Sequence, residues 1–133
     1  MKKKKLYIGC ALTHASEEFK TAIETLKAEL RHDYEILDFI GLVKGTPQDV
    51  FAWDLHCVRA SDLFVADCTY PAIGLGMEIG TALAENKKML VIAHEDAKVT
   101  RIVLGITHPR VTFKRYGNHA EVIAMIREQI EKL

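Results

Sequence analysis

The chain lacks an excess of charge of either sign, a long apolar run and any regular spacing of metal ligands. Lys and Arg number 18 and Asp and Glu number 18, so no net field attracts nucleic acid or an anionic membrane. No run reaches the roughly 18 apolar residues of a membrane-spanning helix. The opening MKKKK leads into too few apolar residues, without a small-residue cleavage site, for a secretory signal. We therefore expect neither nucleic acid nor a membrane as a partner.

Cysteine and histidine occur in numbers and spacings that argue against two common frameworks. The three cysteines, Cys10, Cys57 and Cys68, are odd in number and form no CxxC pair, which favours reduced thiols and a cytoplasmic protein. The six histidines show neither HExxH nor HxH spacing, so no metal site is expected. No repeat, low-complexity tract or linker divides the chain, and its 133 residues suit one domain spanning 1–133.

Short apolar runs alternate along the chain with segments of helical periodicity. We predict strands at 6–12, 34–37, 63–66, 89–93 and 111–113. The helices predicted between and after them run from the N-cap Ser16 to about Leu30, from Thr46-Pro47 to about Ala60, around Glu78 to near Asn86, over 98–104 and over 119–133. This alternation predicts an α/β fold with a single doubly wound five-stranded parallel sheet, flavodoxin-like or Rossmann-like, with strand order 2-1-3-4-5.

The carboxyl ends of the first and third predicted strands are where such a sheet binds ligands, because the winding reverses there. The loops 9–14 and 67–71 meet at this point. The stretch LFVADCTYPAIGLGME adds Gly74 and Gly76, which let the backbone approach a ligand closely. Glu78 then falls in the first turn of the next helix, where the helix dipole favours its ionised form. A charged carboxylate there suits nucleophilic attack on an electron-poor carbon, although Glu and a GxG pair also occur in ordinary helix starts and turns.

A second carboxylate, Asp54, stands on an apolar helix face. Its neighbours one turn away are Val50, Phe51, Cys57 and Val58. Burial there raises the pKa of a carboxyl group, and such a group can donate a proton near neutral pH. Alternatively, Asp54 caps a neighbouring loop or pairs with Arg59 or Arg101. Together with Glu78, it supplies the minimal equipment for cleaving a glycosidic bond, and a small neutral crevice suits a nucleoside better than a polysaccharide.

Four short motifs carry a family resemblance. They are Tyr7-Ile8-Gly9 in the first strand, Asp54 in WDLHCVRASD, VADCT at the end of the third strand, and PAIGLGMEIG around Glu78. The chain resembles the nucleoside 2-deoxyribosyltransferase family over nearly its whole length, with closer likeness to the 2'-deoxynucleoside 5'-phosphate N-hydrolase branch. The resemblance implies a flavodoxin-like sheet, no cofactor or metal, and a homodimer or higher homo-oligomer whose sites are completed by a neighbouring subunit. It also implies that Glu78 attacks C1' to form a covalent glycosyl-enzyme, and that Asp54 helps to protonate the departing base or orients the sugar.

The resemblance also implies a set of substrate-binding residues and two departures from the family pattern. The set is Tyr7, Gly9, Cys10, Leu12, Thr13, Asp67, Ala72, Gly74, Gly76, Met77, Thr100 and Arg101. Members that bind a 5'-phosphate tend to carry an Arg and a Ser where this chain has Thr13 and Ala72, and transferases often carry an Asp at the latter place. Thr100, followed by Arg101, matches the Ser that an adjacent subunit contributes. We therefore expect modest selectivity for a 5'-monophosphate, dependent on Thr100 and Arg101.

Some of these residues have an interpretation that involves no substrate. Trp53 and Tyr70 could stack on a base, or pack in the core and shape a loop. Asp67 could accept a hydrogen bond from the sugar, or only tie down the loop that follows it. Cys10 has no obvious basic partner and suits a small space-filling residue in the crevice.

The leading functional hypothesis is hydrolysis of an N-glycosidic bond in a nucleoside or nucleotide. Exchange of bases between nucleosides is the nearest alternative. A non-catalytic nucleotide-binding or sensing module could use the same crevice. A flavodoxin-like electron carrier fits less well, because the loop after the first strand offers only Thr13 and Ser16 to an FMN phosphate.

Overall fold

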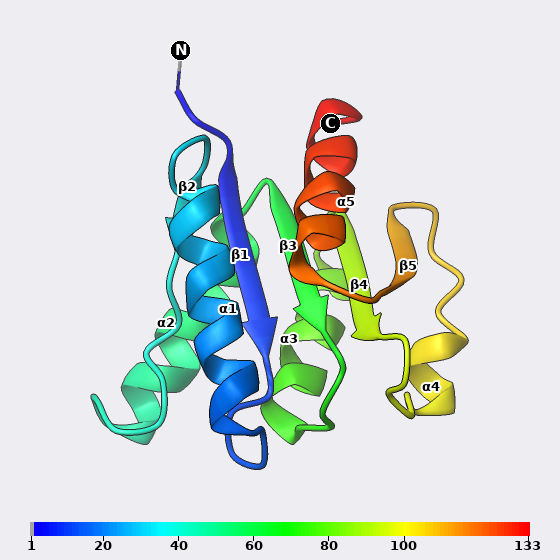
Figure 1. Cartoon of the computed structure of the whole chain (residues 1–133). Coiled ribbons are helices and arrows are strands. Elements are labelled where there is room, and N and C mark those ends of the chain that lie inside the picture. The colour runs from blue at the N-terminus through cyan, green and yellow to red at the C-terminus, as the bar shows by residue number, and fades with distance from the viewer. Residues whose placement is uncertain (1) are drawn as a thin grey trace.

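Five parallel strands form one sheet in the order β2-β1-β3-β4-β5 in the computed structural model, which describes residues 2–133 (Figure 1). The strands are β1 (Lys5–Cys10), β2 (Glu35–Leu37), β3 (Leu63–Asp67), β4 (Met89–His94) and β5 (Val111–Tyr116). The fold class and strand order expected from the sequence are confirmed. The chain therefore reverses its winding direction between β1 and β3, where a ligand crevice is expected.

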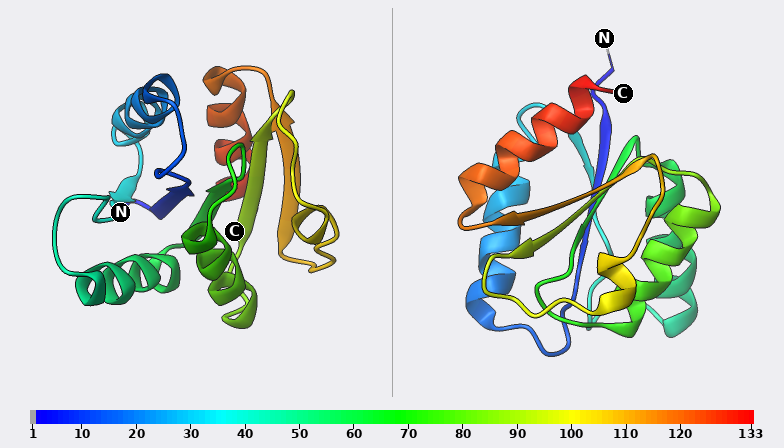
Figure 2. Two further views of the ribbon diagram at one scale, coloured as in Figure 1. Left: turned by 90° about the horizontal axis from the view of Figure 1, so that it is seen from below. Right: turned by 90° about the vertical axis from the view of Figure 1, so that its right-hand side faces the viewer.

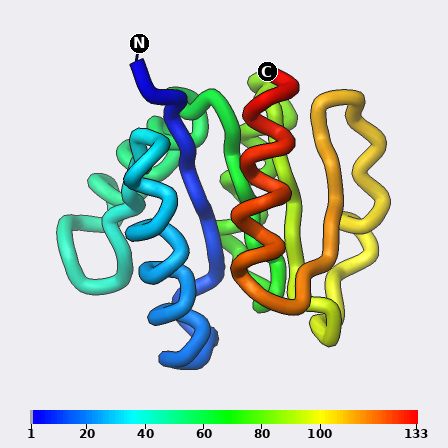
Figure 3. Tube along the Cα trace, turned by 45° about the horizontal axis from the view of Figure 1, so that its top comes forward, coloured from blue at the N-terminus to red at the C-terminus, as the bar shows by residue number. Residues whose placement is uncertain are grey.

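Helices cover both faces of the sheet. They are α1 (Glu17–Leu30), α2 (Pro47–Ala60), α3 (Ile73–Ala84), α4 (Arg101–Leu104) and α5 (His119–Glu131). Viewed along the sheet, α1 and α5 lie on one side and α2 and α3 on the other (Figure 2). Both termini lie at the end of the molecule opposite the carboxyl ends of the strands (Figure 3). Within residues 2–133, the structure contains no helix long and apolar enough to cross a membrane.

The central strands are buried on both faces, which is why they read as continuous apolar runs. All five residues of β3 are buried. Side chains alternate along β1, so Leu6 and Ile8 pack with α1 and α5 while Tyr7 packs with α2 and α3. The face covered by α2 and α3 therefore receives Tyr7, together with any carboxylate that those two helices carry.

The helix that carries Glu78 begins earlier than the sequence suggested. Ala72 is its extended N-cap and Ile73 its first residue, so Gly74 and Gly76 lie inside the helix and Glu78 is its sixth residue. The prediction that Glu78 lies in the first turn is wrong. Glycine is a weak helix former in isolation, but tertiary packing of the apolar face overrides that preference here.

Several other boundaries differ by a few residues. β1 ends at Cys10 instead of residue 12, and β5 continues to Tyr116 because it pairs with β4 as far as His94. The short helix expected over 98–104 contains only Arg101–Leu104, since Thr100 has extended backbone angles and serves as the N-cap. The last helix ends at Glu131.

Candidate active site

A cavity of about 410 Å³ opens beyond the carboxyl end of β1, between α2, α3 and the segment that follows β2. It lies at the side of the sheet where the winding reverses. Its walls are largely apolar. The lining residues are Tyr7, Cys10, Ala11, Leu12, Thr13, Phe39, Gly41, Leu42, Pro47, Val50, Phe51, Asp54, Leu55, Ala72, Gly74, Leu75, Met77 and Glu78.

Glu78 is a nearly buried carboxyl group in the wall of this cavity. The Tyr7 hydroxyl donates a hydrogen bond to its Oε2. On the other side, a Cβ built on Gly9 would lie only 2.8 Å from Glu78 Oε1, so glycine leaves the room that this oxygen occupies. The carboxyl group is thus held between two residues of β1.

Burial raises the pKa of Glu78 to about 7. The hydrogen bond from Tyr7 and the charge of Lys27 act in the opposite direction, and the charge of Asp54 raises the pKa further. The expectation that the helix dipole keeps Glu78 ionised is wrong, because the residue lies in the second turn and desolvation outweighs a dipole that acts within the first turn. Near neutral pH, Glu78 is divided between its charged and neutral forms.

Tyr7 is wholly buried, with its ring stacked on Phe64 at a centroid distance of 5.5 Å. Burial, and then the neighbouring Glu78, raise the pKa of its phenol far above the ordinary value. Tyr7 therefore remains a neutral hydrogen-bond donor at every physiological pH. It fixes the position of Oε2 and stabilises the charged form of Glu78 without carrying a charge itself.

Asp54 faces the same cavity from α2. Burial raises the pKa of its carboxyl group, while a hydrogen bond from the backbone N–H of Ile40 to Oδ1, 3.1 Å long, and the charge of Lys27 lower it. The loop-capping interpretation is thus correct for one oxygen. Arg59 pairs with Glu85 instead, at 3.2 Å. Two carboxyl groups with raised pKa values thus line one largely apolar cavity. Glycosidic cleavage uses such a pair, one group as the acid and the other as the nucleophile.

Comparison with known proteins places this geometry in a family context, although no protein-family model matches the chain. A protein named "Putative 2'-deoxynucleoside 5'-phosphate N-hydrolase 1" from Thermofilum pendens is 26% identical over 138 residues, covering 97% of this chain and 92% of that protein. The protein of the same name from Syntrophotalea carbinolica is 31% identical over 81 residues. The chain is a homologue of these N-hydrolases. That second alignment spans 61% of this chain and only 57% of its relative.

Solved structures agree with the sequence relatives at the level of the fold. A CMP N-glycosidase from Clostridium botulinum has a TM-score of 0.67 and 23% identity, covering 93% of this chain and 99% of its own. A 2-desoxiribosyltransferase from Leishmania mexicana has a TM-score of 0.66 and 14% identity, covering 94% and 97%. The N-hydrolase relatives confirm the resemblance stated from the sequence, and the two solved structures share the fold.

Most of the predicted site residues of this chain lie at one of two cavities. Those that line the cavity with Glu78 and Asp54 are Tyr7, Cys10, Leu12, Thr13, Ala72, Gly74 and Met77. Gly9 stands behind the Glu78 carboxyl group. Gly76 and Thr100 line a separate cavity of about 170 Å³, and Arg101 is exposed beside it. Thr100 and Arg101 were expected to act from a neighbouring subunit, and within one chain they are not part of the main cavity.

Asp67 does not reach the cavity. Its carboxyl group is wholly buried and accepts hydrogen bonds from the Tyr116 hydroxyl at 2.7 Å and from the backbone N–H and hydroxyl of Thr69. Asp67 therefore does not line the cavity within this chain, and its part in substrate binding stays a prediction. Because its side chain is occupied on the far side of the strand end, Asp67 ties down the loop after β3, as the alternative interpretation held.

Trp53 and Cys10 are also clarified by their surroundings. Trp53 is 43% exposed and donates its indole N–H to the backbone oxygen of Asp38, so it belongs neither to the core nor to the cavity wall. Burial raises the pKa of Cys10 to about 12, and its thiol lines the cavity in the neutral form. A space-filling role for Cys10 is consistent with both facts.

Part of the cavity wall escaped the sequence analysis. Phe39, Gly41 and Leu42 follow β2, and Val50 and Phe51 precede Asp54 by one helical turn. The latter two were interpreted as core neighbours of Asp54, yet Phe51 is largely exposed. The signal available in the sequence was the pair Leu42 and Val43, two apolar residues in a loop between Gly41 and Gly45.

Potential metal ligands that lie close together are found outside this cavity in the described part of the chain. Across residues 2–133, the one group of three potential ligands that lie close together is His94, Glu95 and Asp96, at the end of β4. None of the three lines the cavity that contains Glu78. The Nδ1 atom of His94 already accepts a hydrogen bond from the backbone N–H of Asp96.

Proposed function

We propose that this protein is an enzyme that hydrolyses the N-glycosidic bond of a nucleoside, deoxynucleoside or nucleoside 5'-monophosphate through a covalent glycosyl-Glu78 intermediate. The observation that carries the proposal is the buried Glu78 carboxyl group, held by Tyr7 and sharing one cavity with Asp54. The N-hydrolase names of the two relatives, one aligned over nearly its whole length and one over 57% of it, support the proposal.

The proposed chemistry needs two displacements at C1'. In the first, the ionised Glu78 carboxylate attacks C1', the bond from C1' to the base nitrogen breaks, and its electron pair leaves with the base. Asp54, in its protonated form, gives its proton to the departing base. Water then attacks C1', breaks the ester to Glu78, and returns a proton to Asp54. Tyr7 holds Oε2 throughout, which leaves Oε1 to form the bond.

The cavity chemistry suits the neutral part of such a substrate. Large apolar side chains, among them Phe39, Leu42 and Phe51, can cover the faces of a base. The charged side chains that line it are two carboxylates, and its described lining includes no Lys, Arg or His. A phosphate would need cations or amide groups from elsewhere, such as Arg101 and Thr100 of a neighbouring subunit. We propose that 5'-phosphate selectivity is modest and depends on these two residues. Comparison of kcat/KM for matched nucleoside and monophosphate pairs, in wild type and Arg101→Ala, tests this.

To test the reaction, the protein is incubated with a panel of nucleosides and 5'-monophosphates, and the free base released is measured by chromatography. Wild type should release base, and Glu78→Ala should lower turnover by several orders of magnitude. Glu85→Ala, at the end of the same helix, is the matched control and should keep wild-type turnover. In the presence of methanol, double displacement should give only the β-anomer, and an inverted product would contradict a covalent intermediate.

The same assay separates the alternatives. Formation of a new nucleoside on addition of an acceptor base would assign base transfer. Tight ligand binding without turnover, unaffected by Glu78→Gln, would assign a sensing module. A homo-oligomer and a cytoplasmic location remain predictions.

A further inference from the structure

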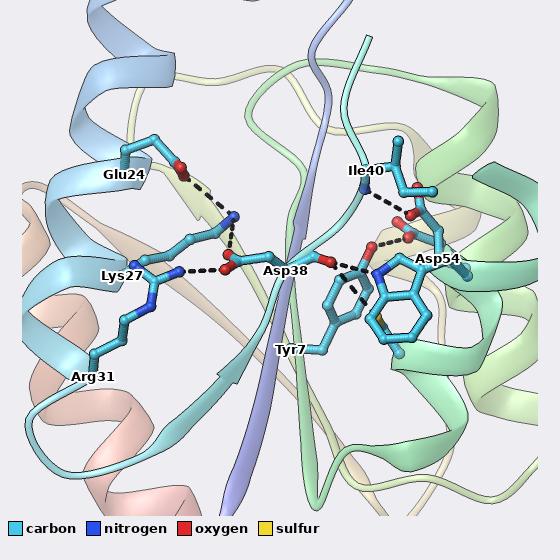
Figure 4. A network of polar contacts seen from close by, with 10 residues as sticks. Tyr7, Glu24, Lys27, Arg31, Asp38, Ile40 and Asp54 are labelled. Carbon is cyan, nitrogen blue, oxygen red and sulfur yellow. Dashed lines mark hydrogen bonds and ion pairs between the residues drawn. The ribbon is translucent and has the colours of Figure 1, made fainter. Parts of the chain in front are cut away.

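Lys27 of α1 is a wholly buried cation with no part in the chemistry proposed above. Its Nζ lies 3.3 Å from Glu24 Oε2 and 3.6 Å from Asp38 Oδ1 (Figure 4). It also lies 3.8 Å from the centre of the Phe39 ring. Burying a charge is costly even when it is paired, so its retention at this position calls for an explanation. Two of its partners, Asp38 and Phe39, belong to the segment after β2 that leads to the cavity, and this location suggests an explanation.

Asp38 is the residue through which Lys27 connects to the second helix. Its two carboxylate oxygens pair with two cations, Oδ1 with Lys27 of α1 and Oδ2 with Arg31, the C-cap residue of that helix. Its backbone oxygen accepts the indole N–H of Trp53 at 2.7 Å and lies 3.8 Å from the thiol of Cys57, both on α2. Asp38 immediately follows β2. It therefore fixes the chain between α1 and α2 at the edge of the sheet.

Two residues further on, the same segment holds the proposed acid. The N–H of Ile40 donates to Asp54 Oδ1, and Phe39, between Asp38 and Ile40, both underlies the Lys27 cation and lines the cavity. Figure 4 shows Ile40 beside Asp54 and Asp38 between the α1 cations and this pair. Beyond Ile40 the chain turns at Gly41 and becomes exposed. The segment 38–40 is consequently fixed from the Asp38 side.

We propose that Lys27, Arg31 and Asp38 form a positioning cluster that fixes residues 38–40 and thereby holds the Asp54 carboxyl group in the orientation needed to protonate the leaving base. This inference rests on the proposed function. Burial raises the pKa of Asp54, whereas the Ile40 hydrogen bond and the charge of Lys27 lower it. The cluster therefore orients the Asp54 carboxyl group, and burial is what favours its protonated form. The cluster thus acts on Asp54 in two ways, through the hydrogen bond from the Ile40 N–H and through the charge of Lys27.

A second ion pair of the same kind serves as the control. Arg127 and Asp33 lie 2.9 Å apart with side chains 44% and 49% exposed, and the Arg31 and Asp38 side chains are 44% and 50% exposed. Neither Arg127 nor Asp33 lines the cavity. Asp38→Asn and Asp33→Asn therefore remove the same charge from equally exposed Arg–Asp pairs. Asp38 differs in its further pairing with the buried Lys27 and in the continuation of its segment to Asp54.

The experiment measures kcat and KM for each variant at its own pH optimum, and the hydrogen exchange of the Ile40 amide by NMR in the full chain. Asp38→Asn should lower kcat about tenfold or more and speed Ile40 exchange about tenfold or more, because small misplacements of a catalytic group reach a hundredfold in rate. KM should stay within about twofold, since proton donation acts in the transition state. Asp33→Asn should leave all three quantities within about twofold.

Asp38→Asn leaves Lys27 with less compensation, so a second variant guards against loss of folding. Lys27→Met/Asp38→Asn removes both charges and keeps the bulk of the buried side chain. It should fold and show the same loss of kcat and faster Ile40 exchange. A folded double variant with wild-type kcat, or an equal fall in Asp33→Asn, overturns the positioning role. Absence of base release by wild type on any substrate overturns the proposed function instead.

Discussion

The carboxyl group of Glu78 is buried beside a neutral phenol, and its pKa of about 7 lies well above the ordinary value of 4.5. A group whose pKa is higher in the folded than in the unfolded chain stabilises the fold fully below the unfolded pKa. That contribution is lost as the pH rises through the folded pKa. The ionised form that a nucleophile requires is therefore the form that destabilises this fold.

Replacement of Glu78 by Gln should stabilise the protein in a pH-dependent way. At pH 8, Glu78→Gln removes a buried charge and should raise the free energy of unfolding by up to about 3 kcal/mol, while turnover is lost. Near pH 4, wild-type Glu78 is protonated in both states and the two proteins should have similar stability. Thermal melts of both proteins at the two pH values measure this. A difference in Tm that is independent of pH would contradict the burial of an ionisable Glu78.

The pH dependence of kcat/KM should report the same group. Because Glu78 must be ionised to attack, activity should fall as the pH drops below about 7. Tyr7→Phe removes a hydrogen bond that lowers the pKa of Glu78, so the acid limb should move to higher pH. Asp54→Asn removes the proposed acid together with a carboxyl group whose ionised form raises the pKa of Glu78, so activity should fall and the acid limb of the residual activity should move to lower pH. If the acid limb moved in the same direction in both variants, the opposite effects of Tyr7 and Asp54 on the pKa of Glu78 would be contradicted.

Gly9 should be intolerant of a side chain for catalytic rather than structural reasons. In Gly9→Ala the new Cβ would lie 2.8 Å from Glu78 Oε1 and 3.0 Å from Phe64 Cε1. The end of the Glu78 side chain can move away, so the protein should fold with a loss of about 1–3 kcal/mol, and kcat should fall about a hundredfold. Gly80→Ala is the control, because its Cβ meets no atom within 4 Å. It should keep wild-type kcat and gain up to about 1 kcal/mol of stability, since alanine is the better helix former inside α3. Kinetics and urea unfolding of both variants decide the point.

At the scale of elements, α2 combines a strong start with a functional middle. Thr46 and Asp49 form a reciprocal capping box, with hydrogen bonds of 3.1 Å and 2.9 Å, and Pro47 is the first helical residue. These features give α2 a definite beginning one and a half to two turns before Asp54. The capping hydrogen bonds stabilise the start of α2 and do not involve the carboxyl group of Asp54.

Loss of the cap should therefore affect stability and not chemistry. Thr46→Ala should lower the free energy of unfolding by about 1 kcal/mol and leave kcat within twofold. Thr25→Ala, the same substitution at an exposed position inside α1, should be neutral or slightly stabilising, because alanine is the better helix former. Urea unfolding and base release measure both effects. A large fall in kcat for Thr46→Ala would show that the helix start takes part in positioning Asp54.

At the scale of the whole molecule, the surface around α4 is unusually apolar for a free face. Ile102 is 82% exposed and Leu104 46% exposed, next to Thr100 and Arg101. Burial of such side chains between two copies would stabilise an oligomer. The family resemblance also implies that this region completes a neighbouring site.

We expect the protein to be a homo-oligomer that Ile102→Lys dissociates. A buried lysine without a partner would disfavour the interface by several kcal/mol. Ala28→Lys adds the same charge at an exposed position on α1 and should leave the assembly intact. Light scattering coupled to size exclusion gives the mass of each variant. A wild-type protein that is fully active as a monomer would refute the expectation.

The sequence by itself determined the fold, because the spacing of apolar residues is a local property set by backbone geometry. Continuous short runs identified the strands buried on both faces, and the alternation of strands with helices indicated a parallel sheet. The strand order expected for such a sheet is the one observed. It also singled out Glu78 and Asp54, since each is a carboxylate at a position where its neighbours are apolar or glycine. Helix starts were less certain, as Gly74 and Gly76 show.

Only the tertiary structure decided the environment of each charge. The protonation of Glu78 depends on Tyr7 and on burial, the role of Asp67 depends on Tyr116, and the burial of Lys27 depends on Asp38 and Phe39. In each case the partner belongs to a different element or segment of the chain. Desolvation and Coulomb energies depend on the distance between atoms in space, which no local spacing in the sequence records.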